Sequence, residues 1–420
     1  MNLIKDSRAL VTVRTINKIL PIPGADFIME AHIDGWSCVV KKDEFKEGDY
    51  CLYFEIDSFL PANDPKFLFL RKNGVKTDDT GAERIRLRSI KLKGIISQGL
   101  ALPLTVLDEQ TVQELLMVVD YSSYDTIDNH AIDAMYEALE TERYGIEEFL
   151  NVTKYERPDE KNGGAGNAKT AGNFPLSIPK TDEDRLQNVY GTLSTHFQDV
   201  YFRPSLKLDG SSITIGYFSD PSYFLTKLDD EMITYNEEKQ ELECTPIPYP
   251  HNYGTSQVIV CSRNLALKYT PESRFWQGVN NNDLATRLKE YCEEYDVQLA
   301  VQGELMGPGI QGNREKLEQY DIYAFRIWDI TNKCFLDDSE FMETCTKLGI
   351  KTVPQYNIIQ PFIEYSSLKE FLAASDIKSI THPIAEGLVY KSINKVLYKG
   401  VMQTLHFKVI NNKFLLKCED

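Results

Sequence analysis

The sequence lacks the long apolar runs and cysteine patterns that mark several protein classes. No window of the 420 residues approaches the roughly 18 to 20 consecutive apolar residues of a membrane helix, and the first residues are too polar for a signal peptide. The eight cysteines include no Cys-x-x-Cys pair, and the six histidines show no ligand spacing. We therefore expect an intracellular protein, cytoplasmic by default, with reduced and mostly buried thiols and no zinc site.

The sequence also has fewer basic residues than acidic ones. Lys and Arg number 46 against 63 Asp and Glu, which gives a formal net charge of −17. A protein that coats nucleic acid nonspecifically needs clustered cations to contact phosphates, so this balance argues against that class. It leaves room for an enzyme with a local basic groove, because residues 84–93 are strongly basic while acidic residues gather in 125–160 and 229–243.

Residues 1–103 alternate short β-prone runs with turn signals, and a small β-barrel is the economical fold. Within 84–93, arginines occupy even positions and lysines odd ones, so the strand alternation reverses near Ser89. We expect a bulge or bend there. This basic segment either faces nucleic acid or a triphosphate, as on an oligonucleotide-binding (OB) barrel, or forms a solvated edge strand protected by charge.

Residues 104–157 show apolar residues at helix spacing, and 161–170 have the composition of a flexible linker. Within this linker, residues 163–170 match the phosphate-binding pattern G-x-x-x-x-G-K-T except at Ala168. A functioning loop of that kind follows a buried strand and opens a helix, and this context is missing, so a phosphate loop is disfavoured.

Helix and strand signals mix from 173 to 420 without the regular alternation of a doubly wound sheet. Strands are predicted at 211–217, 258–261, 299–305, 323–330 and 387–391, and helices at 283–295, with Asp283 as N-cap, and at 339–348. The acidic insertion at 219–256 reads as a solvated loop, with a lid or partner contact as the alternative. We predict an α+β protein with an OB-like β-barrel at 1–103, a helical segment and linker at 104–172, and a third domain at 173–420.

The chemistry centres on Lys207, in the run Lys-Leu-Asp-Gly at 207–210. Alone this run is weak evidence, because three fixed residues occur by chance in roughly one chain in twenty of this length. The ordered companions make it specific. They are Ser-Arg-Asn at 262–264, Gly-Glu-Leu at 303–305, Tyr-Ala-Phe at 323–325, Glu-Gly-Leu-Val-Tyr-Lys at 386–391 and His-Phe-Lys-Val at 406–409.

These residue types suit attack by a lysine on a nucleotide phosphate. A protonated amine is a poor nucleophile, so burial or neighbouring cations must lower the pKa of Lys207, and the flanking leucines favour desolvation. Carboxylates at Asp209, Glu304 and Glu386 could hold a hydrated Mg²⁺. Gly210 would remove a side chain where the backbone passes close to the nucleotide.

The succession closely resembles the covalent nucleotidyltransferase superfamily of ATP-dependent DNA ligases, RNA ligases and mRNA capping enzymes, over essentially all of 173–420. DNA ligases and capping enzymes usually place an arginine five residues after the nucleophilic lysine, where this chain has Ser212. An OB-like barrel ahead of the catalytic domain resembles one group of RNA ligases that join 3′-OH to 5′-phosphate ends. The run from 174 to 188 also resembles the entry to that group's catalytic domain.

The resemblance implies an ATP-dependent RNA ligase that forms lysyl-AMP on Lys207 and an adenylylated RNA 5′ end. It implies that Arg263 contacts the ribose or the RNA end, that Phe325 stacks on adenine, and that Lys408 binds the α-phosphate. Glu304 would contact the ribose or metal-bound waters, and Glu386 would belong with Asp209 to a Mg²⁺ or Mn²⁺ site. Each residue has an ordinary alternative: Phe325 as core, Arg263 as the partner of an acidic loop, and Glu386 as part of a turn.

Two positions depart from the pattern of the relatives. Leu206 stands where many ligases have a polar residue that helps to recognise adenine, so backbone groups would take over that role. Ile410 stands where related ligases often have a second lysine after Lys408, so Lys391, Lys413 or the barrel would supply the second phosphate contact.

The expected partners are RNA ends, including those of a nicked duplex, and a monomer without membrane contact is expected. The alternatives are a DNA ligase, a GTP-dependent capping enzyme, or a catalytically silent RNA-binding protein that keeps only the function of the barrel. The natural substrate is left open between a nick, a single-stranded break and a cleaved tRNA.

Overall fold

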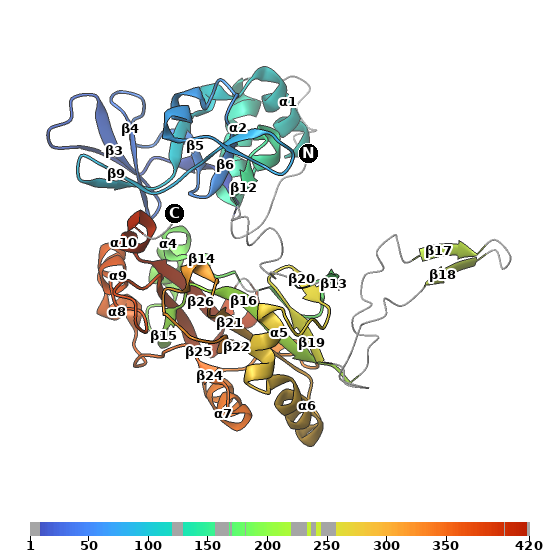
Figure 1. The fold of residues 1–420 in the computed structure, drawn as a ribbon. Helices are drawn as coiled ribbons and strands as arrows, with labels where there is room; N and C mark the ends of the chain where they lie inside the picture. The colour runs from blue at the N-terminus through green and yellow to red at the C-terminus, as the bar shows by residue number, and fades with distance from the viewer. Residues whose placement is uncertain are drawn as a thin grey trace. The chain divides into compact units, whose positions relative to one another are not determined.

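The chain folds into two compact units (Figure 1). The computed structural model describes residues 9–119, 129–155, 168, 170–180, 182–219, 258–398 and 400–417, and the backbone of 233–236 and 241–244. Unit 1 comprises Met1–Glu156, Asp184–Phe197 and Asn412–Asp420, and unit 2 comprises Arg157–Glu183 and Gln198–Asn411. Within the described part of the chain, no helix is long and apolar enough to cross a membrane.

Unit 1 is built from short antiparallel strands and a pair of helices. The strands are β1 (Val11–Thr15), β2 (Lys18–Pro21), β3 (Ile28–Ile33), β4 (Trp36–Lys41), β5 (Tyr50–Phe54), β6 (Ser58–Pro61), β7 (Lys76–Thr77), β8 (Glu83–Arg86), β9 (Ile90–Leu92), β10 (Ile95–Ser97), β11 (Leu100–Pro103), β12 (Thr153–Lys154) and β14 (Asp184–Arg185). The helices are α1 (Glu109–Val118), α2 (Asn129–Glu142), α4 (Leu186–His196) and α10 (Asn412–Lys417), with 3₁₀ turns at Leu68–Asn73, Leu104–Val106 and Glu147–Leu150.

The unit 1 strands form separate small sheets, ordered β1-β5-β11, β2-β3-β4, β12-β6-β8-β7 and β10-β9. No sheet among the described residues closes on itself as a single hydrogen-bonded barrel. The helical prediction for 104–157 is confirmed by α1 and α2, whose Leu115, Met135 and Leu139 pack into the same core as the β1 and β5 side chains. Helix spacing of these apolar residues gives each helix one buried stripe.

The basic segment bends where the alternation of its charges reverses, since β8 ends at Arg86 and β9 begins at Ile90. Neither of the two expected roles, a surface that faces a ligand or a solvated edge strand, describes Arg84 and Arg86. Arg84 lies 2.9 Å from Asp78, and Arg86 lies 2.7 Å from Asp57, with side chains 8% and 5% exposed. Two arginines predicted to face a ligand or solvent are therefore internal ion-pair partners of unit 1.

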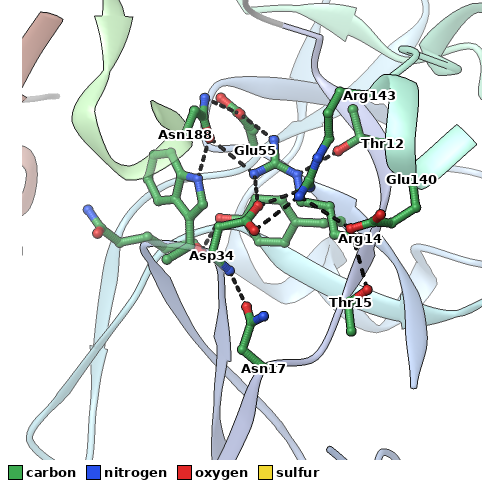
Figure 2. Close-up of polar contacts among 12 residues, drawn as sticks. Thr12, Arg14, Thr15, Asn17, Asp34, Glu55, Glu140, Arg143 and Asn188 are labelled. Carbon is green, nitrogen blue, oxygen red and sulfur yellow. Dashed lines mark hydrogen bonds and ion pairs between the residues drawn. The ribbon is translucent and has the colours of Figure 1, made fainter. Parts of the chain in front are cut away.

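A buried polar cluster holds α4 against the strands of unit 1 (Figure 2). The Asn188 side-chain oxygen accepts hydrogen bonds from Arg14 Nη1 at 3.1 Å and Trp36 Nε1 at 2.6 Å, and its amide nitrogen donates to Glu55 Oε1 at 2.8 Å. Arg14 also contacts Glu55 and Asp34, at 3.1 and 3.0 Å. Asn188 is thus the common partner of three side chains from the strand region, all in the same unit.

Unit 2 contains a large sheet that is antiparallel except for one strand, a smaller antiparallel sheet, a separate two-stranded pair, and helices packed on the two larger sheets. Its strands are β13 (Thr170–Asn173), β15 (Phe202–Lys207), β16 (Ser211–Tyr217), β17 (Ile233–Asn236), β18 (Glu241–Cys244), β19 (Val258–Cys261), β20 (Leu265–Leu267), β21 (Leu299–Met306), β22 (Asp321–Asp329), β23 (Cys334–Phe335), β24 (Lys351–Thr352), β25 (Gly387–Tyr398) and β26 (Val401–Ile410). Its helices are α5 (Arg274–Asn281), α6 (Leu284–Tyr295), α7 (Asp338–Leu348), α8 (Pro361–Glu364) and α9 (Leu368–Ala374), with a 3₁₀ turn at Gln311–Asn313.

The first sheet of unit 2 runs β13-β20-β19-β16-β21-β22-β23, with β24 parallel to β22. Leu284, Leu288 and Cys292 form the buried stripe of α6 and pack with β16 and β21 in the largest core of the unit. In the second sheet, β25 lies between β15 and β26. All the predicted strands and both predicted helices of this region are present. Their ends agree within two residues, except that the strand predicted at 387–391 extends to Tyr398.

Asp283 is the N-cap residue of α6 as predicted, but it does not cap the helix with its side chain. Asp283 occupies the N-cap position but has a left-handed backbone (φ 47°), and its side chain accepts no capping hydrogen bond. A capping box is present instead on α7, where Asp337 and Glu340 cap each other's backbone N–H groups.

Some predicted features lie outside the described residues. These are most of the phosphate-loop-like run at 163–170 and most of the acidic insertion at 219–256, of which the backbone of β17 and β18 is described as a two-stranded pair. The six cysteines that the structure describes are unpaired, and all but Cys334 are buried, in agreement with the expected thiols.

Candidate active site

Lys207 ends β15, and residues 208–210 turn the chain into β16. Its Nζ lies 2.8 Å from Glu386 Oε1, at the point where β15 pairs with the start of β25. Leu206 and Leu208 are 2% and 3% exposed and pack in a small apolar cluster with Met306. The two leucines therefore anchor the turn in the apolar cluster, and the Lys207 amine lies beside the Glu386 carboxylate.

Gly210 is required by the neighbouring strand β21. A Cβ at this position would lie 2.5 Å from Met306 Sδ and 2.6 Å from the Leu305 carbonyl oxygen. The Gly210 N–H donates to Glu304 Oε1 at 2.9 Å. The structure thus gives a second reason for glycine at this position, the close packing of the turn against β21, and the expected approach to a nucleotide stays a prediction.

The antiparallel register places several cations on one face of the second sheet. Lys207 pairs with Gly387, Lys408 with Val389, and His406 with Lys391. Paired residues on adjacent antiparallel strands point to the same side, and positions two apart along a strand share a face. Lys207, Lys391, His406 and Lys408 therefore line one face, which the predicted order of motifs alone does not reveal.

A buried carboxylate neutralises part of this cationic face. Glu183 Oε1 lies 3.6 Å from Arg326 Nη2, and both side chains are largely buried. Burial alone would raise the pKa of Glu183, but Arg326, His406 and Lys408 lower it to about 2. Burial and Arg326 lower the pKa of His406 to about 3, so this imidazole is neutral.

Lys391 holds the strand that carries Phe325. Its ammonium lies 5.2 Å from the centroid of the Phe325 ring and donates to the Phe325 carbonyl oxygen. The register between β21 and β22 shifts at this point, because Gln302 pairs with Arg326 while Gly303 pairs with Ala324. Phe325 is thus the extra residue of a bulge, which re-aims its side chain. Its half-buried ring packs against the cluster around Leu206.

Burial and Arg326 also lower the pKa of Lys391, to about 7. Lys391 and Phe325 share the lining of a cavity with Arg203, Phe335 and Phe341. In this structure the amine of Lys391, one of the three candidates for the second phosphate contact, is engaged with the Phe325 carbonyl oxygen.

The three carboxylates proposed for the metal have protein partners in this structure. Asp209 Oδ2 lies 3.3 Å from Arg314 Nε, Glu304 accepts from Gly210, and Glu386 pairs with Lys207. Burial, followed by the charges of Glu386 and Asp209, raises the pKa of Glu304 to about 8. Burial would lower the pKa of Lys207, but Glu386 and Glu304 outweigh it and raise this pKa above its usual value. The predicted lowering is therefore not seen here.

The donor set fits a hydrated Mg²⁺ or Mn²⁺ better than a tightly enclosed ion. Among the residues that the structure describes, no group of three or more His, Cys, Asp or Glu side chains is gathered closely enough to hold a metal. However, burial raises the pKa of Glu304 and the charges of Glu386 and Asp209 raise it further, so a divalent cation near these carboxylates would favour the ionised form of Glu304. Mg²⁺ keeps several waters and is often held through few carboxylates.

Arg263 and Lys408 meet at a residue that the sequence analysis did not single out. Arg263 lies in the turn between β19 and β20, and Lys408 lies on β26. The Asp182 carboxylate contacts both, at 2.9 Å from Arg263 Nη2 and 2.8 Å from Lys408 Nζ. The acidic partner proposed as the ordinary alternative for Arg263 therefore exists, but it comes from the segment before α4.

Glu183, Arg326 and His406 also belong to this site and were not predicted as site residues from the sequence. Two signals were present: His406 stands two residues before Lys408 on the same strand, and Arg326 interrupts an apolar strand. Leu206 is buried and its N–H donates to the Pro354 carbonyl oxygen at 2.8 Å, so this backbone N–H is already engaged.

Comparisons with known proteins agree with this arrangement. A family model described as an OB-fold domain matches residues 10–104, and one described as RNA ligase matches residues 203–410. A search of curated proteins finds no match. Solved structures of Naegleria gruberi RNA ligase are similar over the whole chain. A mutant with ATP and Mn shows 30% identity and a TM-score of 0.72, covering 98% of this chain and 100% of that one. The same ligase with PPi shows 30% identity and a TM-score of 0.71, covering 97% and 98%.

Proposed function

Because the chain belongs to the RNA ligase family, we propose that it seals RNA 3′-OH and 5′-phosphate ends with ATP and that Lys207 carries the AMP. The observation that supports this assignment is the Lys207–Glu386 pair at 2.8 Å on the cationic face of the second sheet. Residues 203–410, which match the RNA ligase model, contain Lys207 and all the residues that we propose to contact ATP or the metal ion.

In the first step, the Lys207 amine attacks the α-phosphorus of ATP. A nitrogen–phosphorus bond forms, the bond from the α-phosphorus to the bridging oxygen breaks, and pyrophosphate leaves. The raised pKa of Lys207 keeps the amine protonated, so a proton must leave before attack, and Glu386 is positioned to receive it. A Mg²⁺ or Mn²⁺ ion held by Asp209, Glu304 and Glu386 would favour the neutral amine and offset charge on the phosphate.

The remaining proposed contacts position the nucleotide. Lys408 would bind the α-phosphate, Phe325 would stack on adenine, and Arg263 would contact the ribose or the RNA end. Lys391 would act by fixing the bulge that presents Phe325, since its amine binds the Phe325 carbonyl. In the later steps, AMP passes from Lys207 to the RNA 5′-phosphate, and the 3′-OH then attacks that activated end and releases AMP.

The test is a sealing assay with matched strands. RNA with a 3′-OH should be joined to a 5′-phosphorylated end in the presence of ATP, while GTP should not support the reaction and a DNA 3′-OH strand should be the poorer substrate. Preference for DNA would favour a DNA ligase, and use of GTP would favour a capping enzyme. RNA binding that ATP does not affect, without any joined product, would favour a silent RNA-binding protein.

We also propose functional divisions at 1–103, 104–172 and 173–420, a monomeric enzyme, and a cytoplasmic location. The OB-fold match at residues 10–104 supports the first division. RNA ends, including those of a nicked duplex, are the proposed partners, and the natural substrate is to be found by comparing nicks, single-stranded breaks and cleaved tRNA in the same assay.

A further inference from the structure

The carboxylate of Asp182 forms ion pairs with two cationic side chains, Lys408 and Arg263, which we propose to contact ATP and RNA. Asp182 Oδ1 lies 2.8 Å from Lys408 Nζ, and Asp182 Oδ2 lies 2.9 Å from Arg263 Nη2. The two cations come from different parts of unit 2, the strand β26 and the turn after β19. Asp182 thus spans them with its two oxygens, as the oxygens of a phosphate would.

The next residue makes a different kind of contact. The Glu183 side chain is 13% exposed and pairs with Arg326, which is 5% exposed. The Asp182 side chain is 34% exposed, belongs to no helix or strand, and one of its partners, Arg263, is 47% exposed. Glu183 is therefore a fixed counter-ion of the buried face, whereas Asp182 has room to exchange its partners with solvent or a ligand.

The balance of charge around Lys408 explains why Asp182 would exchange with a bound phosphate. Without a bound phosphate, Lys408 stands on the same face as Lys391, and its charge acts together with that of Arg326 on Glu183, so a further anion compensates positive charge at this face. A phosphate that binds Lys408 supplies that negative charge itself, and it would repel a carboxylate at the same position. Asp182 and the α-phosphate therefore compete for Lys408.

We propose that Asp182 is an exchangeable internal anion, which holds Lys408 and Arg263 when ATP is absent, yields Lys408 to the α-phosphate of ATP, and thereby releases Arg263 for the ribose or the RNA end. This inference rests on the proposed function, because it takes Lys408 as a phosphate-binding residue. Asp182 is a positioning residue, which acts through its two partners and forms no bond with the reacting atoms.

Removal of the Asp182 charge should therefore lower the ATP concentration needed for lysyl-AMP formation while the rate of the chemical step stays nearly the same. The variant Asp182→Asn keeps the shape of the side chain and removes its charge. Since partly exposed ion pairs contribute little each, we expect the KM for ATP in lysyl-AMP formation to fall about two- to fivefold. The maximal rate should change less than about twofold, because Asp182 contacts neither Lys207 nor Glu386 in the ion pairs described.

The experiment measures lysyl-AMP formation against ATP concentration for the full chain, without RNA. Asp182→Glu restores the charge and should return the KM toward the wild-type value. Glu343→Gln is the control for net charge, because Glu343 pairs with Lys347 on the exposed surface of α7 at 2.8 Å, and it should leave the KM unchanged. Asp182→Ser provides a second neutral variant if the asparagine variant does not fold.

A folded Asp182→Asn variant with an unchanged or higher KM would overturn the inference, because a purely structural support for Lys408 predicts weaker ATP binding when it is removed. Failure of the proposed function looks different. In that case the wild-type chain forms no lysyl-AMP at any ATP concentration, and no KM can be measured for any variant.

Discussion

Single residues of the site show which chemistry the sequence reveals and which it conceals. The nucleophile candidate Lys207 and its partner Glu386 were both predicted, since each stands in a recognisable short run, and the structure brings them to 2.8 Å. The sequence predicted a lowered pKa for Lys207, whereas in this structure its pKa is raised. A sequence shows the apolar neighbours Leu206 and Leu208 but does not show that two carboxylates, Glu386 and Glu304, face the amine.

Glu304 makes the stability of unit 2 depend on pH. Its pKa in the unfolded chain is near the ordinary 4.5, and in the folded chain it is raised to about 8. Between these values the unfolded carboxyl has lost its proton while the folded one keeps it, so stability falls as pH rises, by at most about 1.4 kcal/mol per pH unit. We predict that Glu304→Gln reduces this decline between pH 5 and 8.

Thermal unfolding of both proteins in metal-free buffer measures the effect. The melting temperature of the wild type should fall relative to that of Glu304→Gln as pH rises through this window. Glu183 should not obscure the result, because its lowered pKa stabilises the fold above pH 4.5 and that contribution is lost only toward pH 2. Parallel pH curves for the two proteins would show that Glu304 is not perturbed in this way.

Among the secondary-structure elements, buried strands were the most predictable. The predicted ranges 211–217 and 258–261 coincide with β16 and β19. Val258–Cys261 is a continuous apolar run of the kind that identifies a strand in a covered sheet, whereas Ser211–Tyr217 is rich in β-branched and aromatic residues. Asp283 shows the opposite case, since its residue type suits an N-cap but its backbone is left-handed. Local composition does not determine that conformation.

Helix α4 shows that an element's place in the sequence need not give its place in the fold. It lies beyond residue 173, in the region predicted to be catalytic, yet Asn188 joins it to Arg14, Trp36 and Glu55 of unit 1 (Figure 2). These contacts span 133 to 174 residues of sequence. No periodicity or local motif predicts pairs at that separation.

We predict that Asn188→Ala weakens unit 1 by about 1 to 3 kcal/mol, because it leaves buried polar groups of three partners without their shared amide. Hydrogen exchange measured on peptides should show faster exchange for α4, β1 and β5 together, with β16 and β21 of unit 2 unchanged. Asn281→Ala is the matched control, since its exposed amide makes one hydrogen bond, to the Tyr320 carbonyl in unit 2. Faster exchange in α4 alone would contradict the assignment of this helix to unit 1.

For the whole molecule, the order of motifs was the informative signal. An OB-fold domain followed by an RNA ligase domain was predicted from the resemblance and is confirmed by the family matches at 10–104 and 203–410. The bridge from Asp182 to Lys408 was not predicted, because 226 residues separate its ends and neither belongs to the other's motif. Sequence order therefore identifies the chemistry, whereas the counter-ions that prepare the site come from the folded chain.

The central claim is that Lys207 becomes covalently adenylylated, and the most direct measurement of it needs no RNA. The chain is incubated with ATP labelled at the α-phosphate and with Mg²⁺ or Mn²⁺, then denatured. We predict that the wild type retains the label and gains the mass of one AMP, and that Lys207→Ala shows neither. Lys289→Ala is the control and should behave as the wild type, because Lys289 pairs with Glu293 on the surface of α6. Equal labelling of Lys207→Ala would contradict the account.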